Sequence, residues 1–215
     1  QDALALASQQ KAAAAQDAGK FKDEIVPVVI PQKKGDPLVV DTDEYLNRKS
    51  TAEALAGLRP AFDTAGSVTA GNASPLTDGA SATLVCSEEF AQAHGIPILA
   101  RIRSIAISGC APEVMGLGPI LSTQKALQRA GLSVADLDII ELNEAFASQS
   151  IACIRDLGLD TAKINLDGGA IALGHPLGAT GARITGKAAA LLKREGKQFA
   201  LATQCIGGGQ GIATI

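Results

Sequence analysis

From residue 79 onward, strand-like and helix-like segments alternate, and this alternation constrains the fold more than any other feature. Apolar, β-branched runs predict strands at 80–87, within 96–109, before 143 and at 197–206, and a strand or strand-like arm near 162–167. Helical patterns lie between them, at 88–95, after 143 and after the glycine-rich 168–178. Short connections between alternating elements predict a layered α/β fold with helices against a sheet.

The first 78 residues have a different pattern. An alanine-rich helix is expected at 1–18, ended by Gly19, because glycine readily adopts the left-handed conformation that follows a helix. Prolines interrupt the β-branched residues at 20–40, which predicts edge strands or extended arms. Residues 41–78 are rich in turn formers, with one short helix expected at 51–57.

Composition narrows the class of protein. The chain has 215 residues, 47% of them hydrophobic, with few aromatic side chains, so the core must be aliphatic. A net charge of −3 argues against a broad nucleic-acid footprint. The four cysteines form no CxxC pair and no zinc spacing, so we expect free thiols and no metal site. No apolar run reaches a membrane-spanning length, so no membrane contact is expected. The free thiols and the lack of a signal pattern predict a cytoplasmic location, with targeting to an organelle by a lost N-terminus as the alternative.

Three unusual short segments each follow a predicted strand. Asn143 follows DIIEL, His175 follows NLDGGAIAL with an intervening glycine, and Cys205 follows FALATQ. Since the carboxyl ends of strands in α/β folds line one crevice, an amide, an imidazole and a thiol are expected to meet there.

Each of these residues also has a structural interpretation. A lone histidine is more often structural, yet His175 lies among small residues just before a helix start, which favours a neutral, accessible ring. Cys205 could be a small buried hydrophobe, although the glycines after it could free backbone N–H groups for an oxyanion. Asn143 could be the N-cap of the next helix or could hold a water or substrate oxygen.

Four motifs in this order resemble the thiolase family. They are GNASPLTDGA (71–80), NEAFA (143–147), GGAIALGHPLGATGAR (168–183) and CIGGGQG (205–211). The resemblance covers essentially the whole chain and implies the layered α-β-α thiolase fold with a mixed sheet. It also implies an acyl-CoA C-acyltransferase, which condenses acetyl-CoA units or cleaves a 3-ketoacyl-CoA with CoA.

The resemblance implies a role for each site residue. His175 would activate a nucleophilic cysteine, Cys205 would be the general acid/base, Asn143 would hold the water of one oxyanion hole, and the N–H of Gly207 would belong to the other. CoA and acyl-CoA would be substrates, with no tightly bound cofactor. The residues implied to line the CoA and substrate path are Leu55, Phe62, Ala70, Ser74, Ala145 and Phe146; Arg48 or lysines at 20–34 would meet CoA phosphates.

The family also has a nucleophilic-cysteine motif that no cysteine of this chain matches. The chain begins without methionine and ends inside a predicted strand, so part of a longer polypeptide is expected. The implied organisation is the rear of a CoA-binding loop domain at 1–78, the last strand and helix of the N-terminal half at 79–96, and the C-terminal domain at 97–215. The missing N-terminal half, on the same or another chain, would be the partner, within a homodimer or homotetramer.

Alternative functions remain open from the sequence. A longer-chain degradative 3-ketoacyl-CoA thiolase differs from an acetyl-CoA acetyltransferase by pocket depth. A condensing ketosynthase would carry a histidine in place of Cys205. A non-catalytic CoA-binding module or a cysteine hydrolase using Cys205 and His175 belongs to a different class, and a hydrolase would not depend on free CoA.

Overall fold

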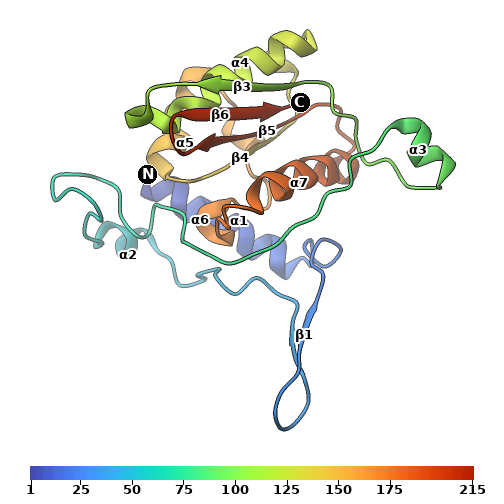
Figure 1. The fold of residues 1–215 in the computed structure, drawn as a ribbon. Coiled ribbons are helices and arrows are strands. Elements are labelled where there is room, and N and C mark those ends of the chain that lie inside the picture. The colour runs from blue at the N-terminus through green and yellow to red at the C-terminus, as the bar shows by residue number, and fades with distance from the viewer.

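The computed structural model describes residues 1–215 and is built around a four-stranded mixed sheet (Figure 1). The strand order is β3 (Ile105–Gly109), β6 (Gln210–Thr214), β5 (Ala200–Ile206) and β4 (Ile139–Leu142). Strand β6 runs antiparallel to both of its neighbours, whereas β4 and β5 are parallel. The carboxyl ends of β4 and β5 therefore lie at the same edge of the sheet.

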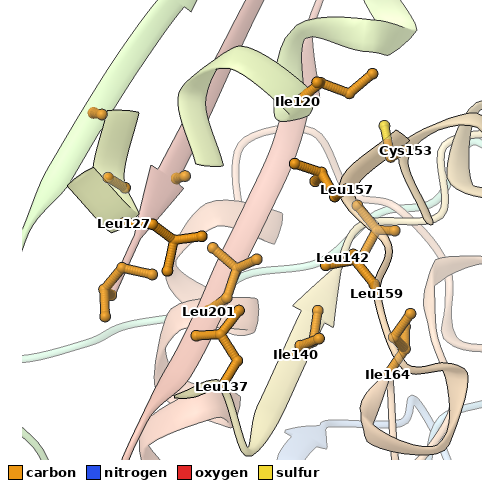
Figure 2. Packing of buried hydrophobic residues seen from close by; sticks show 14 of the residues in the cluster. Ile120, Leu127, Leu137, Ile140, Leu142, Cys153, Leu157, Leu159, Ile164 and Leu201 are labelled. Carbon is orange, nitrogen blue, oxygen red and sulfur yellow. The ribbon is translucent and has the colours of Figure 1, made fainter. Parts of the chain in front are cut away.

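Helices cover both faces of this sheet. Helices α4 (Gly118–Ala130) and α5 (Ala147–Leu157) lie on one face, and α7 (Thr180–Glu195) lies on the other (Figure 1). The main core lies under α4 and α5 and contains Leu127, Leu142, Leu157 and Leu201 (Figure 2). A second cluster joins Ile139 to Ile184 and Leu191 of α7. Alternate side chains of β4 and β5 thus point into different layers, and the expected α-β-α fold is confirmed.

A backbone-to-backbone contact explains two of the glycines. A Cβ on Gly118, at the start of α4, would collide with the backbone of Gln210 and Gly211. A Cβ on Gly211 would collide with the backbone of Gly118 in turn. The absence of side chains lets α4 begin directly against β6.

Helix α1 (Asp2–Asp17) belongs to the body of the molecule. Ala5 of α1, Leu55 of α2 (Ala52–Ala56), Ala147 of α5 and Ile171 of α6 (Ala170–Leu173) form a third buried cluster. Small residues dominate α1, so its backbone packs closely against its neighbours. The predicted helices at 1–18 and 51–57 are both confirmed.

Two segments extend away from the body (Figure 1). Strands β1 (Val28–Ile30) and β2 (Leu38–Val40) pair as an antiparallel hairpin, which confirms the extended arm expected at 20–40. The second segment, residues 79–104, begins against the start of α7 and then leaves the body, with α3 (Glu88–Ala93) at its outer end.

The strand predicted at 80–87 is wrong. These residues form no ladder, and Leu84 and Val85 are 69% and 67% exposed. Only the Ser81 and Thr83 hydroxyls hold the segment, by donating to backbone carbonyls at Ala179 and Ala182 at the start of α7. The apolar composition suits a buried strand, but this chain supplies no neighbouring strand with which it could pair.

The arm expected near 162–167 is a turn rather than a strand. It contains a 3₁₀ turn at Thr161–Lys163 and a single bridge from Ile164 to Ile140. Further 3₁₀ turns lie at Pro112–Leu117 and Val134–Asp136. None of the helices is both long and apolar enough to cross a membrane.

Candidate active site

Asn143 lies just beyond the end of β4 and continues its ladder by one step. Its N–H donates to the Thr203 carbonyl on β5 at 3.0 Å, two residues before Cys205. The side chain of Asn165 clamps the strand end, since its Oδ1 accepts from the Leu142 N–H and its Nδ2 donates to the Leu142 carbonyl, at 3.0 and 2.9 Å. The position of Asn143 is therefore fixed by its own backbone bond to β5 and by the Asn165 side chain that holds the residue before it.

Glu144 ties this strand end to two other elements. Its carboxylate accepts from Ser8 Oγ of α1 at 2.7 Å, from Asn165 Nδ2 at 2.8 Å and from the Ile171 N–H of α6 at 3.1 Å. Burial raises the pKa of Glu144, although these donors oppose the shift. Glu144 thus holds the chain on both sides of the site. Its role was not predicted from the sequence, although it directly follows Asn143.

His175 lies between α6 and α7, so the prediction that it follows a strand is wrong. Gly174 has φ +96°, and a Cβ there would collide with the Thr77 side chain, so the turn before His175 requires glycine. The ring is partly buried and lines an open hollow of about 440 Å³ formed by residues 76–79 and 175–178. The small neighbours therefore do leave the ring accessible.

Asn143 and His175 meet directly. Asn143 Nδ2 lies 3.3 Å from His175 Nε2, and His175 Nδ1 lies 2.7 Å from the hydroxyl of Thr180, the first residue of α7. Burial, together with the positive charge of Arg183, lowers the pKa of His175 below its usual 6.5. The neutral ring that the sequence predicts is thus supported, with burial as the larger cause.

The N-cap interpretation of Asn143 is wrong. Helix α5 begins after Phe146, and no side chain caps it. Asn143 is 1% exposed, and its Oδ1 has no hydrogen-bond partner within the protein. A buried amide oxygen without a partner is costly, so this atom suits a bound water or a ligand donor.

Cys205 is buried near the end of β5, opposite Gly211 of β6. No hydrogen bond joins its thiol to His175 or Asn143. Burial raises the pKa of Cys205 above the usual 9.0. In this structure Cys205 is therefore a protonated thiol at neutral pH.

Gly207 is the first residue after β5, in the turn that leads to β6. It is exposed, and a Cβ there would meet no atom within 4 Å. The turn itself is made by Gly208 and Gly209, which have φ +88° and +91°. Gly207 therefore borders open space, as a backbone donor to a ligand would.

Four of the six residues predicted to line the substrate path lie together. Ser74 donates both its N–H and its hydroxyl to the Ala145 carbonyl, at 2.9 and 3.1 Å. Phe62 and Phe146 meet edge to face, with ring centroids 6.2 Å apart. Ala70 is exposed nearby in the sequence, whereas Leu55 is buried and packs toward Gly71 and α1. Leu55 therefore belongs to the core rather than to an open surface.

The basic residues predicted to meet CoA phosphates are dispersed. Arg48 donates to both Asp17 carboxylate oxygens, at 3.0 and 2.8 Å, and to Gln16 Oε1. Lys20 contacts Asp167 at 3.4 Å. Lys33 and Lys34 are exposed in the loop of the β1–β2 hairpin. Arg48 and Lys20 already have carboxylate partners, so they are weaker candidates for a phosphate than the hairpin lysines.

Family comparison agrees with the four motifs. The model described as "Thiolase, N-terminal domain" matches residues 1–89, and the model described as "Thiolase, C-terminal domain" matches residues 96–215. The chain belongs to the thiolase family. The acetyl-CoA acetyltransferase of Chromobacterium violaceum is 54% identical to this chain over 99% of its length. The acetyl-CoA acetyltransferase of Escherichia coli is 56% identical over 100% of its length. Each alignment covers 54% of the relative.

Solved thiolase structures have the same fold. The Bacillus anthracis acetyl-CoA acetyltransferase superposes with a TM-score of 0.96 at 44% identity, covering 99% of this chain and 54% of that one. Human mitochondrial 3-ketoacyl-CoA thiolase in complex with CoA gives a TM-score of 0.89 at 44% identity, covering 99% of this chain and 52% of that one. This thiolase chain thus spans about half the length of the relatives it matches.

The comparisons correct one expectation about the domains. Because the N-terminal domain model matches residues 1–89, the prediction that the N-terminal half is missing is not supported.

The remaining cysteines are scattered. Cys86 is exposed on the unpaired 79–87 segment, Cys110 contacts the Val114 carbonyl, and burial raises the pKa of Cys153 to about 11.

Proposed function

We propose that this chain carries the acid–base and oxyanion-binding part of an acyl-CoA C-acyltransferase site. The observation that carries the proposal is the contact between Asn143 Nδ2 and His175 Nε2, beside the strand end that bears Cys205. An imidazole, an amide with a free oxygen and a thiol are the groups that thioester exchange with proton transfer at carbon requires.

In this proposal His175 accepts the proton of a thiol nucleophile, which attacks an acyl-CoA. The new thioester forms as the bond to CoA breaks, and the leaving CoA thiolate takes the proton back from His175. Cys205 removes the α-proton of acetyl-CoA, and the resulting carbanion attacks the acylated thiol. The new carbon–carbon bond forms as the thiolate leaves, and the reverse sequence is thiolysis. A water held by Asn143 Oδ1 stabilises the charge on one thioester oxygen. The N–H of Gly207 stabilises the charge on the other thioester oxygen.

The protonated state of Cys205 supports thiolysis in particular. Cleavage of a 3-ketoacyl-CoA leaves a carbanion that needs a proton, and burial keeps the Cys205 thiol protonated by raising its pKa. His175 starts neutral because its pKa is lowered, so it can take the proton of an incoming thiol. Each group therefore begins in the protonation state that this direction needs.

CoA and acyl-CoA are the proposed substrates, and no tightly bound cofactor is required. The pair Phe62 and Phe146, with the Ser74 loop, offers an apolar wall beside Ala145. The hairpin lysines at 33 and 34 provide positive charge for phosphates. The names of the relatives include both acetyl-CoA acetyltransferase and 3-ketoacyl-CoA thiolase, so short and longer acyl chains are both candidates.

The proposal also covers assembly and location. The nucleophilic thiol is assigned to none of this chain's cysteines, because none forms a hydrogen bond with His175. A homo-oligomer in the cytoplasm is expected, and the exposed Leu84 and Val85 support association through the 79–87 segment.

The test is CoA-dependent cleavage of acetoacetyl-CoA, followed by loss of the 3-ketoacyl thioester absorbance. The chain is assayed alone and with the part of the Escherichia coli relative that it does not cover, and 3-ketohexadecanoyl-CoA is compared as a long-chain substrate. The matched variants are Cys205→Ser, His175→Asn and Cys86→Ser, of which the last changes an exposed thiol outside the site.

Cleavage that requires CoA is expected under at least one condition. Cys205→Ser and His175→Asn should lower the rate by a factor of 100 or more, on the order of the 10²–10⁴ that acid–base catalysis supplies. Cys86→Ser should leave it unchanged. Equal turnover without CoA would indicate a hydrolase, and CoA binding without cleavage under every condition would indicate a non-catalytic module.

A further inference from the structure

Thr180 provides the only hydroxyl that is hydrogen-bonded to the His175 ring. Its Oγ1 lies 2.7 Å from His175 Nδ1 and 3.1 Å from the Pro176 carbonyl oxygen. Thr180 is fully buried, so no bulk water competes for these contacts. It is also the first residue of α7, so its position is fixed by the helix that carries it.

The Pro176 carbonyl determines which way the hydroxyl proton points. A carbonyl oxygen can only accept, so the 3.1 Å contact is favourable only if the Thr180 hydroxyl donates to it. If the hydroxyl donated to the ring instead, two oxygens would face each other with no hydrogen between them. Because a hydroxyl has a single proton, Thr180 Oγ1 must accept from the ring.

The ring tautomer follows from this. A neutral imidazole has one N–H, and the 2.7 Å contact with an acceptor oxygen places it on Nδ1. Nε2 is then the unprotonated nitrogen, and the Asn143 amide must present its NH₂ to it. That orientation leaves Asn143 Oδ1 as the free buried oxygen, in agreement with its lack of a partner.

We propose that Thr180 is a positioning residue that holds His175 in the Nδ1–H tautomer, so that Nε2 is the base that faces the reacting thiol. Thr180 touches no substrate and acts only through the ring. The catalytic meaning of this tautomer rests on the proposed function. The tautomer itself is a property of the folded chain.

The experiment is ¹⁵N NMR of the imidazole nitrogens at pH 7.5. The chain has only two histidines, so a His94→Gln background leaves His175 as the single imidazole signal. His94 is exposed just after the end of α3, far along the sequence from the site. In that background we compare Thr180, Thr180→Ser, which keeps the hydroxyl, and Thr180→Val, which keeps the shape and removes it.

The expected spectra show Nδ1–H for the parent and for Thr180→Ser, and a shift toward Nε2–H for Thr180→Val. An Nε2–H ring in the parent would overturn the proposal, as would an unchanged Nδ1–H ring in Thr180→Val. Should Thr180→Val not fold, the parent spectrum alone still decides the tautomer, and Thr180→Ser must reproduce it.

Kinetics separate this inference from the proposed function. If thiolysis occurs, Thr180→Val should reduce it by on the order of tenfold to a hundredfold, and Thr180→Ser should restore it. Loss of rate in Thr180→Val without a change of tautomer would reduce Thr180 to a structural role. The chain could also show no thiolysis at all while its His175 ring is Nδ1–H and this depends on Thr180. That result would contradict the proposed function but not the tautomer assignment.

Discussion

At the scale of single residues, His175 shows how the surroundings of a side chain set its protonation state. It is the one ring in contact with both the Asn143 amide and the Thr180 hydroxyl. Its partial burial disfavours the imidazolium, and Arg183 adds to the same effect. The chain therefore holds a neutral base beside a hydrogen-bond donor without a carboxylate partner.

This predicts a dependence on pH at His175. The folded ring should titrate below 6.5, the value for the unfolded chain, so the folded state binds fewer protons in that interval. The free energy of unfolding should thus fall as pH decreases from about 6.5 through the folded pKa. Arg183→Gln should raise the pKa of His175 in an NMR titration. Arg155 is exposed on α5, so Arg155→Gln is the control. An equal rise of the His175 pKa in Arg155→Gln would contradict the assignment of the shift to the charge of Arg183.

At the scale of elements, buried ion pairs join α7 to Asp167, which lies in the segment before α6. Asp167 is fully buried and contacts Arg194 Nη1 at 2.5 Å, Lys187 Nζ at 2.7 Å and Lys20 Nζ at 3.4 Å. Burial alone would raise the pKa of Asp167, but hydrogen bonds from Arg194 and Lys187 outweigh it and lower the pKa to about 2. The carboxylate therefore stabilises the fold above pH 3.8, and this contribution is lost as pH falls through about 2.

Removing this carboxylate should be costly. Asp167→Asn leaves the buried Lys187 with Glu24 as its remaining carboxylate partner, and should lower the free energy of unfolding by about 3 kcal/mol. Urea denaturation at pH 7 measures the change. Asp17→Asn is the matched control, because it breaks an exposed pair with Arg48. An equal decrease in the free energy of unfolding in the two variants would show that the Asp167 ion pairs do not stabilise the packing of α7.

Elements were predictable where the local pattern and the packing agree. The helix of α1, the strand β4 and the CIGGGQG turn follow from composition and glycine placement alone. The prediction of a strand at 80–87 was wrong because a strand must pair with a neighbouring strand, whereas the sequence shows only that these residues favour the extended conformation. The arm before His175 failed because NLDGGAIAL contains a four-residue helix, too short for a periodic signal.

At the scale of the whole molecule, the site depends on segments far apart in the sequence. The sequence identified Asn143, His175 and Cys205 through their motifs, and the structure brings the first two into contact. The sequence could not reveal that Ser8 and Asn165 hold Glu144 beside Asn143, because those partners lie 136 and 21 residues away. It also could not reveal that burial raises rather than lowers the pKa of Cys205.

The most direct test of the account is proton exchange at the methyl carbon of acetyl-CoA. Cys205 is proposed to move a proton at this carbon while a water held by Asn143 Oδ1 binds the thioester oxygen, and this half-reaction needs no acylated cysteine. Acetyl-CoA is incubated with the chain in D₂O, and deuterium entering the methyl group is followed by NMR or mass spectrometry. Cys205→Ala and Cys86→Ala are compared, the latter changing an exposed thiol. The account predicts exchange that Cys205→Ala abolishes and Cys86→Ala retains; exchange that survives in Cys205→Ala would contradict it.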